Sequence, residues 1–448
     1  MKYLFILTIF LVFIGCSTKK VQTIEIEKFQ EKNETIVKNI PIYDLENIPQ
    51  NTEFYSKNIN QATLYNIQNK YYKSYFTVWN LENVKASLNE IKWPFSKYNK
   101  TTSYGENLQP LENDFFNEML IESNFKNYAT INKNGITVKL SNIRSFPTIR
   151  PLLKDPSKAG EGFPFDYIQN STIQANKPIF VSHYSLNKEW VYIFTSFTSG
   201  WIKTNNMVFL DKKYTKVIEE SKQVKITKDN IPIYDENEKF LFNSKIGMNL
   251  ALIEETQDNY IVLTISSYKN QEPLYNRSKI SKNMSSLNTL IFNNNNLSNI
   301  LDNISNTNYG WGGLYEQRDC SSTLRDFFAP FGIWLPRNSY QQSKIGKIVS
   351  LENLDSQTKV KLIKEKAIPF KTLLYKKGHI LLYVGIYNDE IVVFHNTWGI
   401  KTYSKGIEGR KIIGKPIFSS LQLGKNQTNY DKESELLENL KSMNILIK

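Results

Sequence analysis

A single internal cysteine, Cys320, constrains this 448-residue chain more than any other feature. The only other cysteine is Cys16, near the amino terminus. Directly after Cys320, apolar residues follow the spacing of one helix face: Leu324, Phe327, Phe328 and Phe331. A helix that begins at Cys320 would direct the positive end of its dipole at the sulfur, which favours a thiolate. The pattern therefore predicts an activated thiol nucleophile at a helix start.

Two of the chain's three histidines, His379 and His395, flank a predicted β-hairpin whose turn lies near 388–389. A thiol nucleophile needs an imidazole base and a polar group that orients it, and we predict that His379 is the base. A two-residue turn would place Asn396 on the face of His379, and a register shift of one residue would place His395 there. Either residue is therefore a candidate for the orienting group. A zinc site is a weaker alternative, because close-spaced pairs of ligands are missing.

The first 16 residues combine a basic start, a short apolar run and the sequence Phe-Ile-Gly-Cys at 13–16. This end resembles a bacterial lipoprotein box, in which cleavage leaves Cys16 as the acylated first residue. The apolar run is short for a membrane span, which favours a signal peptide over an uncleaved anchor. In an exported chain with Cys16 acylated, Cys320 has no disulfide partner. A chemical role for Cys320 is then favoured over a buried inert cysteine.

The composition is that of a soluble globular protein, with 40% hydrophobic and 22% charged residues. The net charge is +13, and the basic residues are spread along the chain without a long run. This distribution disfavours nucleic acid as a partner. It agrees with binding to anionic lipid or to an anionic polymer such as a cell wall.

The length and the changing period of the apolar residues predict several domains. We expect a signal peptide over 1–16, a linker over 17–45, a mainly helical segment over 46–130, two small barrels of short strands over 131–213 and 214–283, a last domain over 284–424 and a carboxy-terminal tail over 425–448. In the last domain a helix precedes three β runs, which predicts an α+β layered fold.

Motifs in the segment 309–399 resemble, in order, the landmarks of the NlpC-type family of bacterial cell-wall cysteine peptidases. They are Tyr-Gly-Trp-Gly-Gly before Asp-Cys-Ser-Ser, Leu-Pro-Arg-Asn-Ser-x-Gln-Gln, Gly-His-Ile-x-Leu-Tyr-x-Gly and His-Asn-x-Trp-Gly. The segments 144–148 and 161–169 are similar to the first barrel of such enzymes. The resemblance implies a papain-like α+β catalytic domain, preceded by two all-β SH3-like barrels and a helical segment that wraps around them.

The resemblance also implies roles for individual residues. Cys320 would be the nucleophile, His379 the base and His395 the orienting group. The residues that match the substrate pocket are Tyr309, Asp319, Ser321 and Ser339. Asp319 would bind the substrate's amine, and Tyr309 would help to hold the oxyanion. Many relatives carry Asp at the position of Asn338, so the contact of this residue is open. Read from the residues alone, Asp319 is a helix N-cap.

The family implies hydrolysis of peptidoglycan stem peptides between D-Glu, at its γ-carboxyl, and the following diamino acid, with a preference for a free N-terminal L-Ala. One alternative is a catalytically silent lipoprotein that binds wall fragments or a partner. Another is an acyltransferase or amidase on the same fold. No cofactor, metal or nucleic acid is expected. We expect a monomer, lipid-anchored on the periplasmic side of a membrane in the bacterial envelope, with the outer membrane favoured.

Overall fold

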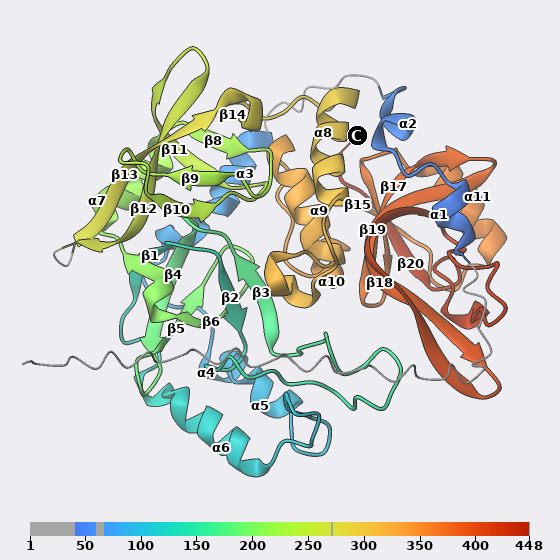
Figure 1. The fold of residues 1–448 in the computed structure, drawn as a ribbon, viewed down its shortest axis with the longest axis horizontal. Coiled ribbons are helices and arrows are strands. Elements are labelled where there is room, and N and C mark those ends of the chain that lie inside the picture. Colours follow the sequence, from blue (N-terminus) through green and yellow to red (C-terminus); the bar gives the residue numbers. More distant parts are fainter. Residues whose placement is uncertain (1–40, 60–66, 270–271, 448) are drawn as a thin grey trace, which may run out of the picture. The chain divides into compact units, whose positions relative to one another are not determined.

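The computed structural model describes residues 41–59, 67–269 and 272–447. The predicted signal peptide, the lipidation site Cys16 and most of the predicted linker lie outside these residues. From Pro41 onward the contacts form one unit, in which four parts follow one another along the chain (Figure 1). None of the described helices is long and apolar enough to cross a membrane.

The amino-terminal part consists of short helices that contact the other parts of the unit. They are α1 (Tyr43–Asn47), α2 (Thr52–Ser56), α3 (Ile67–Tyr75), α4 (Leu88–Ile91), α5 (Trp93–Lys97) and α6 (Asn113–Glu122). The Thr52 hydroxyl donates to Asp302 of the last domain at 2.7 Å. The Trp79 indole N–H donates to the carbonyl of Gly135 in the first sheet at 2.8 Å. The amino-terminal part therefore contacts both the first sheet and the last domain.

The second part is a seven-stranded antiparallel sheet. Its strands are β1 (Lys133–Thr137), β2 (Ser141–Arg144), β3 (Gln169–Ile173), β4 (Pro178–Tyr184), β5 (Trp190–Phe194), β6 (Ser199–Lys203) and β7 (Met207–Phe209), in the order β3-β2-β6-β5-β4-β1-β7. β-branched residues, which favour strands, fill its core: Ile143, Ile179, Val181, Val191, Ile193 and Ile202. Helix α7 (Lys212–Glu220) leads to the next sheet.

The third part has a five-stranded antiparallel sheet in the order β13-β12-β11-β8-β14 and a separate hairpin of β9 and β10. The strands are β8 (Gln223–Ile226), β9 (Pro232–Tyr234), β10 (Phe240–Asn243), β11 (Asn249–Glu255), β12 (Asn259–Lys269), β13 (Glu272–Ser281) and β14 (Ser285–Ser286). Two successive all-β parts are therefore present, as predicted.

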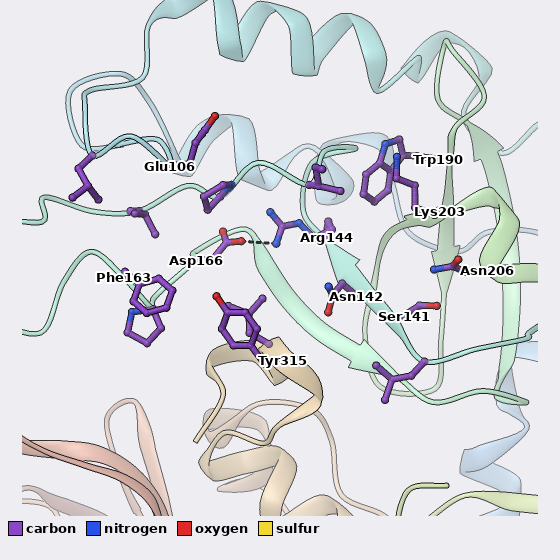
Figure 2. A pocket seen from close by; sticks show the side chains of 17 residues that line it. Glu106, Ser141, Asn142, Arg144, Phe163, Asp166, Trp190, Lys203, Asn206 and Tyr315 are labelled. Atoms are coloured by element: carbon purple, nitrogen blue, oxygen red, sulfur yellow. Dashed lines mark hydrogen bonds and ion pairs between the residues drawn. The ribbon is translucent and has the colours of Figure 1, made fainter. Parts of the chain in front are cut away.

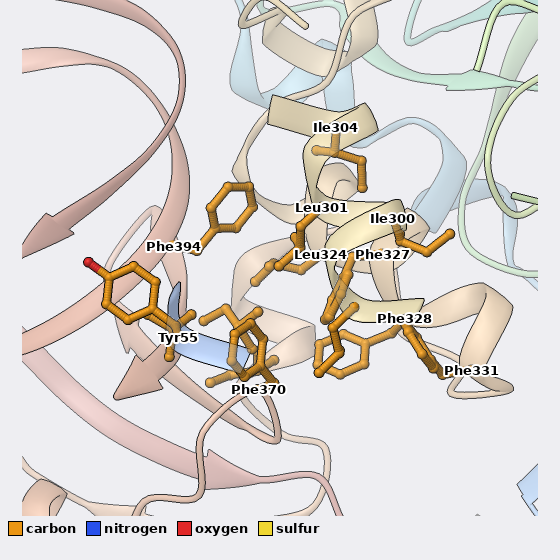
Figure 3. Close-up of a cluster of buried hydrophobic side chains, with 14 of the residues drawn as sticks. Tyr55, Ile300, Leu301, Ile304, Leu324, Phe327, Phe328, Phe331, Phe370 and Phe394 are labelled. Atoms are coloured by element: carbon orange, nitrogen blue, oxygen red, sulfur yellow. The ribbon is translucent and has the colours of Figure 1, made fainter. Parts of the chain in front are cut away.

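The last domain combines helices with a six-stranded antiparallel sheet, which confirms the α+β prediction. The helices are α8 (Asn294–Ser305), α9 (Cys320–Phe328), α10 (Ser339–Gln342) and α11 (Ser356–Lys366). The strands are β15 (Lys347–Ser350), β16 (Thr372–Lys376), β17 (His379–Tyr387), β18 (Glu390–Ser404), β19 (Ile407–Ser420) and β20 (Leu440–Ile445), in the order β15-β20-β16-β17-β18-β19. The predicted apolar face of α9 is fully buried against α8 and the sheet (Figure 3).

The segment 425–448 is not a tail, because it supplies β20, which lies between β15 and β16. Met443 of this strand is fully buried in the core. The apolar residues Leu440, Met443 and Ile445 do not alternate cleanly, so the local pattern does not predict a strand. Hydrogen bonding to a neighbour on each side makes this segment a strand.

His183 of β4 predicts how the stability of the fold depends on pH. It is fully buried, its Nε2 lies 3.1 Å from the carbonyl oxygen of Ser123, and burial lowers its pKa to about 4. Below pH 6.5 the imidazole of His183 is protonated in the unfolded chain, but in the folded chain it stays neutral until about pH 4. The folded state therefore loses stability as the pH falls through this window. We expect this group to cost on the order of 2 kcal/mol between pH 7 and pH 5. Urea unfolding should show a smaller loss for His183→Asn, which cannot titrate; equal losses would contradict this prediction.

Candidate active site

Cys320 is the first residue of α9, and Asp319 is the N-cap of that helix. Asp319 Oδ1 accepts a hydrogen bond from the backbone N–H of Ser322 at 2.9 Å, and Ser322 Oγ accepts one from the backbone N–H of Asp319 at 2.9 Å. This reciprocal cap fixes where the helix begins. It therefore fixes the position of the sulfur, and Cys320 is only 8% exposed.

The thiol and the imidazole are both held in their neutral forms. Burial, and then the charge of Asp319, raise the pKa of the Cys320 thiol to about 12. Backbone N–H groups, among them that of Ile380, lower this pKa but by less. Burial, and then Lys376, lower the pKa of His379 to about 3. Desolvation therefore opposes the thiolate that the helix dipole favours. The thiol proton must leave during nucleophilic attack rather than before it.

The hairpin of β17 and β18 contains a bulge that decides which side chain meets His379. Asn388 and Asp389 both have positive φ, 47° and 63°, which gives the predicted two-residue turn. Further along, the register shifts by one residue between Tyr383 and Gly385. Gly385 has φ 142°, a conformation that favours glycine.

The bulge brings His395, and not Asn396, to the face of His379. His379 Nε2 lies 2.8 Å from His395 Nδ1. The amide of Asn396 points to the other face, where it donates to the carbonyl of Arg318 at 2.8 Å and to the hydroxyl of Thr323 at 3.1 Å. The sequence allowed two registers for this hairpin. The structure has the register that is shifted by one residue, which places His395 beside His379.

A serine behind His395 assigns the protons of the histidine pair. Ser419 donates its hydroxyl proton to the carbonyl of Ser420 at 2.9 Å, so its oxygen accepts a hydrogen bond from His395 Nε2 at 3.0 Å. His395 Nδ1 is then unprotonated and accepts the N–H of His379 Nε2. His379 Nδ1 therefore carries the free lone pair that a base requires. Sequence reasoning did not identify Ser419, which lies on β19, far from the quoted motifs.

Arg337 connects the nucleophile helix to the first sheet. Its Nη2 lies 2.6 Å from Asp319 Oδ2, its Nη1 donates to Ser321 Oγ at 2.9 Å, and its Nε donates to Ser171 of β3 at 2.7 Å. Asp319 is therefore already paired before any substrate binds. Arg337 belongs to the motif Leu-Pro-Arg-Asn-Ser-x-Gln-Gln, but the sequence predicted no role for it.

Arg318 makes the matching connection to the second sheet's domain. It is almost fully buried and binds Asp229 through both terminal nitrogens and Asp326 of α9 through Nε at 2.7 Å. The only feature of the sequence that pointed to a role for Arg318 was its position two residues before Cys320. The two arginines tie the start of α9 to both β parts.

Cys320 and Tyr309 lie where two clefts meet. The barrel-side cleft, about 610 Å³, is lined by all four predicted substrate residues and by side chains of the first sheet and the amino-terminal helices. The sheet-side cleft, about 370 Å³, is lined by His379 and His395 and by residues of β18 and β19. An extended chain could thus cross the sulfur with one end in each cleft.

Two further predicted residues have defined environments. Asn338 caps α10 by accepting the backbone N–H of Gln341 at 2.9 Å. Burial, and then Cys320 and Asp319, raise the pKa of the Tyr309 hydroxyl well above its usual value. Tyr309 therefore keeps its proton and can donate it to an oxyanion.

A third cavity, about 520 Å³, lies over β2 and the loop that follows it (Figure 2). An ion pair of 2.5 Å between Arg144 and Asp166 forms part of its wall. None of the predicted site residues lines this cavity.

Four family models match the chain in the predicted order. They are the NLPC_P60 stabilising domain at 5–128, an SH3 domain of the SH3b1 type at 151–203, an SH3 domain of the SH3b2 type at 211–257 and the NlpC/P60 family at 306–412. These matches confirm the resemblance drawn from the sequence motifs.

Solved structures of this family are similar to the chain. An NlpC/P60 endopeptidase from Photobacterium damselae subsp. piscicida is 26% identical, with 91% of this chain and 98% of that chain covered and a TM-score of 0.77. An NlpC/P60 family protein from Bacillus cereus is 16% identical, with coverages of 62% and 82% and a TM-score of 0.40. No curated protein matches the chain.

The geometry predicts different effects for the two neighbours His395 and Asn396. His395→Ala should lower kcat by at least about 10²-fold, because His379 loses the group that sets its tautomer. Asn396→Ala should lower the free energy of unfolding by about 1–3 kcal/mol and leave kcat within about tenfold, because it breaks buried hydrogen bonds away from the base. Peptide hydrolysis and urea unfolding of both variants check this. A larger loss of kcat for Asn396→Ala would contradict the assignment of the orienting group.

Proposed function

Residues 306–412 form an NlpC/P60 domain behind two SH3-type domains, and on this premise we propose that the chain is a cysteine peptidase that cleaves peptidoglycan stem peptides. The family match supports a hydrolase that acts on cell-wall peptides. One observation carries the assignment of residues. Cys320, His379 and His395 line one cleft, and the two imidazoles are joined at 2.8 Å.

In the proposed mechanism, His379 Nδ1 takes the thiol proton as the Cys320 sulfur attacks the scissile carbonyl carbon. The Tyr309 hydroxyl and the backbone N–H of Cys320, at the start of α9, stabilise the oxyanion. The C–N bond then breaks, and His379 gives the proton to the leaving amine. Water, deprotonated by His379, hydrolyses the resulting thioester and restores the thiol. His395 orients His379 throughout.

The bond that we propose is the one between the γ-carboxyl of D-Glu and the diamino acid, with a free L-Ala amine in the barrel-side cleft. Asp319 Oδ1 accepts hydrogen bonds from the backbone N–H and the hydroxyl of Ser322, among others. Asp319 Oδ2 has one partner, Arg337. Oδ2 is therefore the oxygen available to an ammonium group. Because Arg337 already offsets the charge of Asp319, the preference for a free amine should be moderate.

We propose in addition that the protein acts as a monomer, anchored through an acylated Cys16 on the periplasmic side of a membrane. This proposal rests on the lipoprotein-like sequence at 13–16. Acylation at that position would keep the peptidase close to its polymeric substrate.

Cys320→Ala should lower the hydrolysis of L-Ala-γ-D-Glu-diamino acid peptides by more than about 10³-fold without unfolding the domain. The control is the unfolding free energy, which should change little because only one buried sulfur atom is removed. If the wild type binds these peptides without cleaving them, the chain is a binding protein. If the variant keeps wild-type activity, Cys320 is not the nucleophile.

Acylation of the substrate's amine should lower kcat/KM by about 10- to 100-fold, the effect of losing one hydrogen bond to a charged group. The measurement compares L-Ala-γ-D-Glu-diamino acid with its N-acetylated form. Asp319→Asn, which keeps the shape of the cap, should reduce this difference. Equal cleavage of both peptides would mean that the barrel-side cleft is open at that end.

A further inference from the structure

The sheet-side cleft carries an excess of positive charge. Four cationic and two acidic side chains line it: Lys376, Lys377, Lys401, Arg410, Asp431 and Glu435. Both acids already have partners within the protein. Asp431 lies 3.4 Å from Lys401, and Glu435 accepts the hydroxyl of Tyr430 at 2.9 Å. Arg410 is paired with Glu408 at 2.7 Å.

Lys376 is the cation of this cleft that stands beside the catalytic base. It is the last residue of β16 and pairs with His379, the first residue of β17, across the turn at Lys377 and Gly378. Within the described chain its ammonium has neither an ion pair nor a hydrogen bond, and Lys376 is partly buried. The charge of Lys376 also lowers the pKa of both His379 and His395.

A partly buried ammonium without a partner is unfavourable, because it has lost water and gained nothing in exchange. Burial accordingly lowers the pKa of Lys376. A second cation nearby also opposes the imidazolium that forms when His379 takes the thiol proton. An anionic group in the cleft would remove both penalties at once. Among the described residues no acidic side chain pairs with Lys376, so the substrate is the natural source of such a group.

We propose that Lys376 is a specificity residue that binds a carboxylate on the leaving side of the scissile bond, carried by the diamino acid of the stem peptide. This inference rests on the proposed function and names the chemistry of the leaving part of its substrate. Lys377, which is exposed at the turn, adds to the attraction at the mouth of the cleft.

Two carboxylates could fill this place, and they belong to the same chemical class. One is the main-chain carboxylate of a diamino acid that ends the peptide. The other is the side-chain carboxylate of a diaminopimelic acid, which lysine lacks. Peptides in which each carboxylate is present or absent in turn therefore identify the one that Lys376 binds.

The test uses four peptides of the form L-Ala-γ-D-Glu-X, with X either meso-diaminopimelic acid or L-lysine, each as the free acid and as the main-chain amide. For the two peptides that carry the recognised carboxylate, Lys376→Met should raise KM by about 10- to 100-fold. For the two peptides that lack this carboxylate, the change in KM should stay within about threefold. Lys376→Arg should restore most of the affinity, because Arg also pairs with carboxylates. Lys347→Met, which removes an exposed charge of β15 outside the cleft, is the matched control.

Binding of the same peptides to Cys320→Ala and to Cys320→Ala with Lys376→Met, measured by calorimetry, separates this inference from the proposed function. If the wild type cleaves none of the peptides, the proposed function is wrong, while a carboxylate-dependent difference in binding still supports the role of Lys376. Equal effects of Lys376→Met on all four peptides, or no effect on any, would overturn the inference. In the first of these cases Lys376 would act only on the base or on the fold.

Discussion

Two buried arginines hold the start of α9, and the position of Cys320 depends on them. Arg318 binds Asp229 in the second SH3-type domain, and Arg337 reaches Ser171 in the first. Buried charges are stable only when they are paired, and removing one partner costs about 3–5 kcal/mol. Both SH3-type domains are therefore part of the frame of the active site. They cannot be treated as modules that only tether the enzyme to the wall.

The last residues of the predicted linker are part of the folded unit, because α1 begins at Tyr43, and they are connected to the histidine pair. Asp44 is buried and accepts the backbone N–H of Ser420 at 2.8 Å, next to Ser419, which binds His395. Gln50 donates to the carbonyl of Phe418 and accepts its N–H, at 2.7 and 3.0 Å. It thereby covers the free edge of β19, which would otherwise expose unpaired backbone groups. The amino-terminal segment thus supports the strand that sets the tautomer of the pair.

Desolvation governs the chemistry of the site. Burial keeps the Cys320 thiol and the His379 imidazole neutral at rest, against the effect of the helix dipole. A neutral pair needs no counter-ion in the closed site and becomes charged only as a substrate is attacked. The two clefts differ in charge, because Lys97 and the paired Asp319 and Arg337 line the barrel-side cleft, whereas four cations and two acids line the sheet-side cleft. A substrate therefore meets a different electrostatic environment on each side of the sulfur.

The sequence by itself determined the nucleophile helix, the two sets of short strands and the place of the hairpin turn, because apolar period, turn residues and caps are local properties. The motifs also identified the residues that line the clefts. The sequence left open whether His395 or Asn396 faces His379, and the bulge at Gly385, formed by strand pairing, decided this. Tertiary structure alone placed β20 in the sheet and joined Arg318 and Ser419 to their partners. Pairing between distant segments depends on how the whole chain packs, and no local pattern records it.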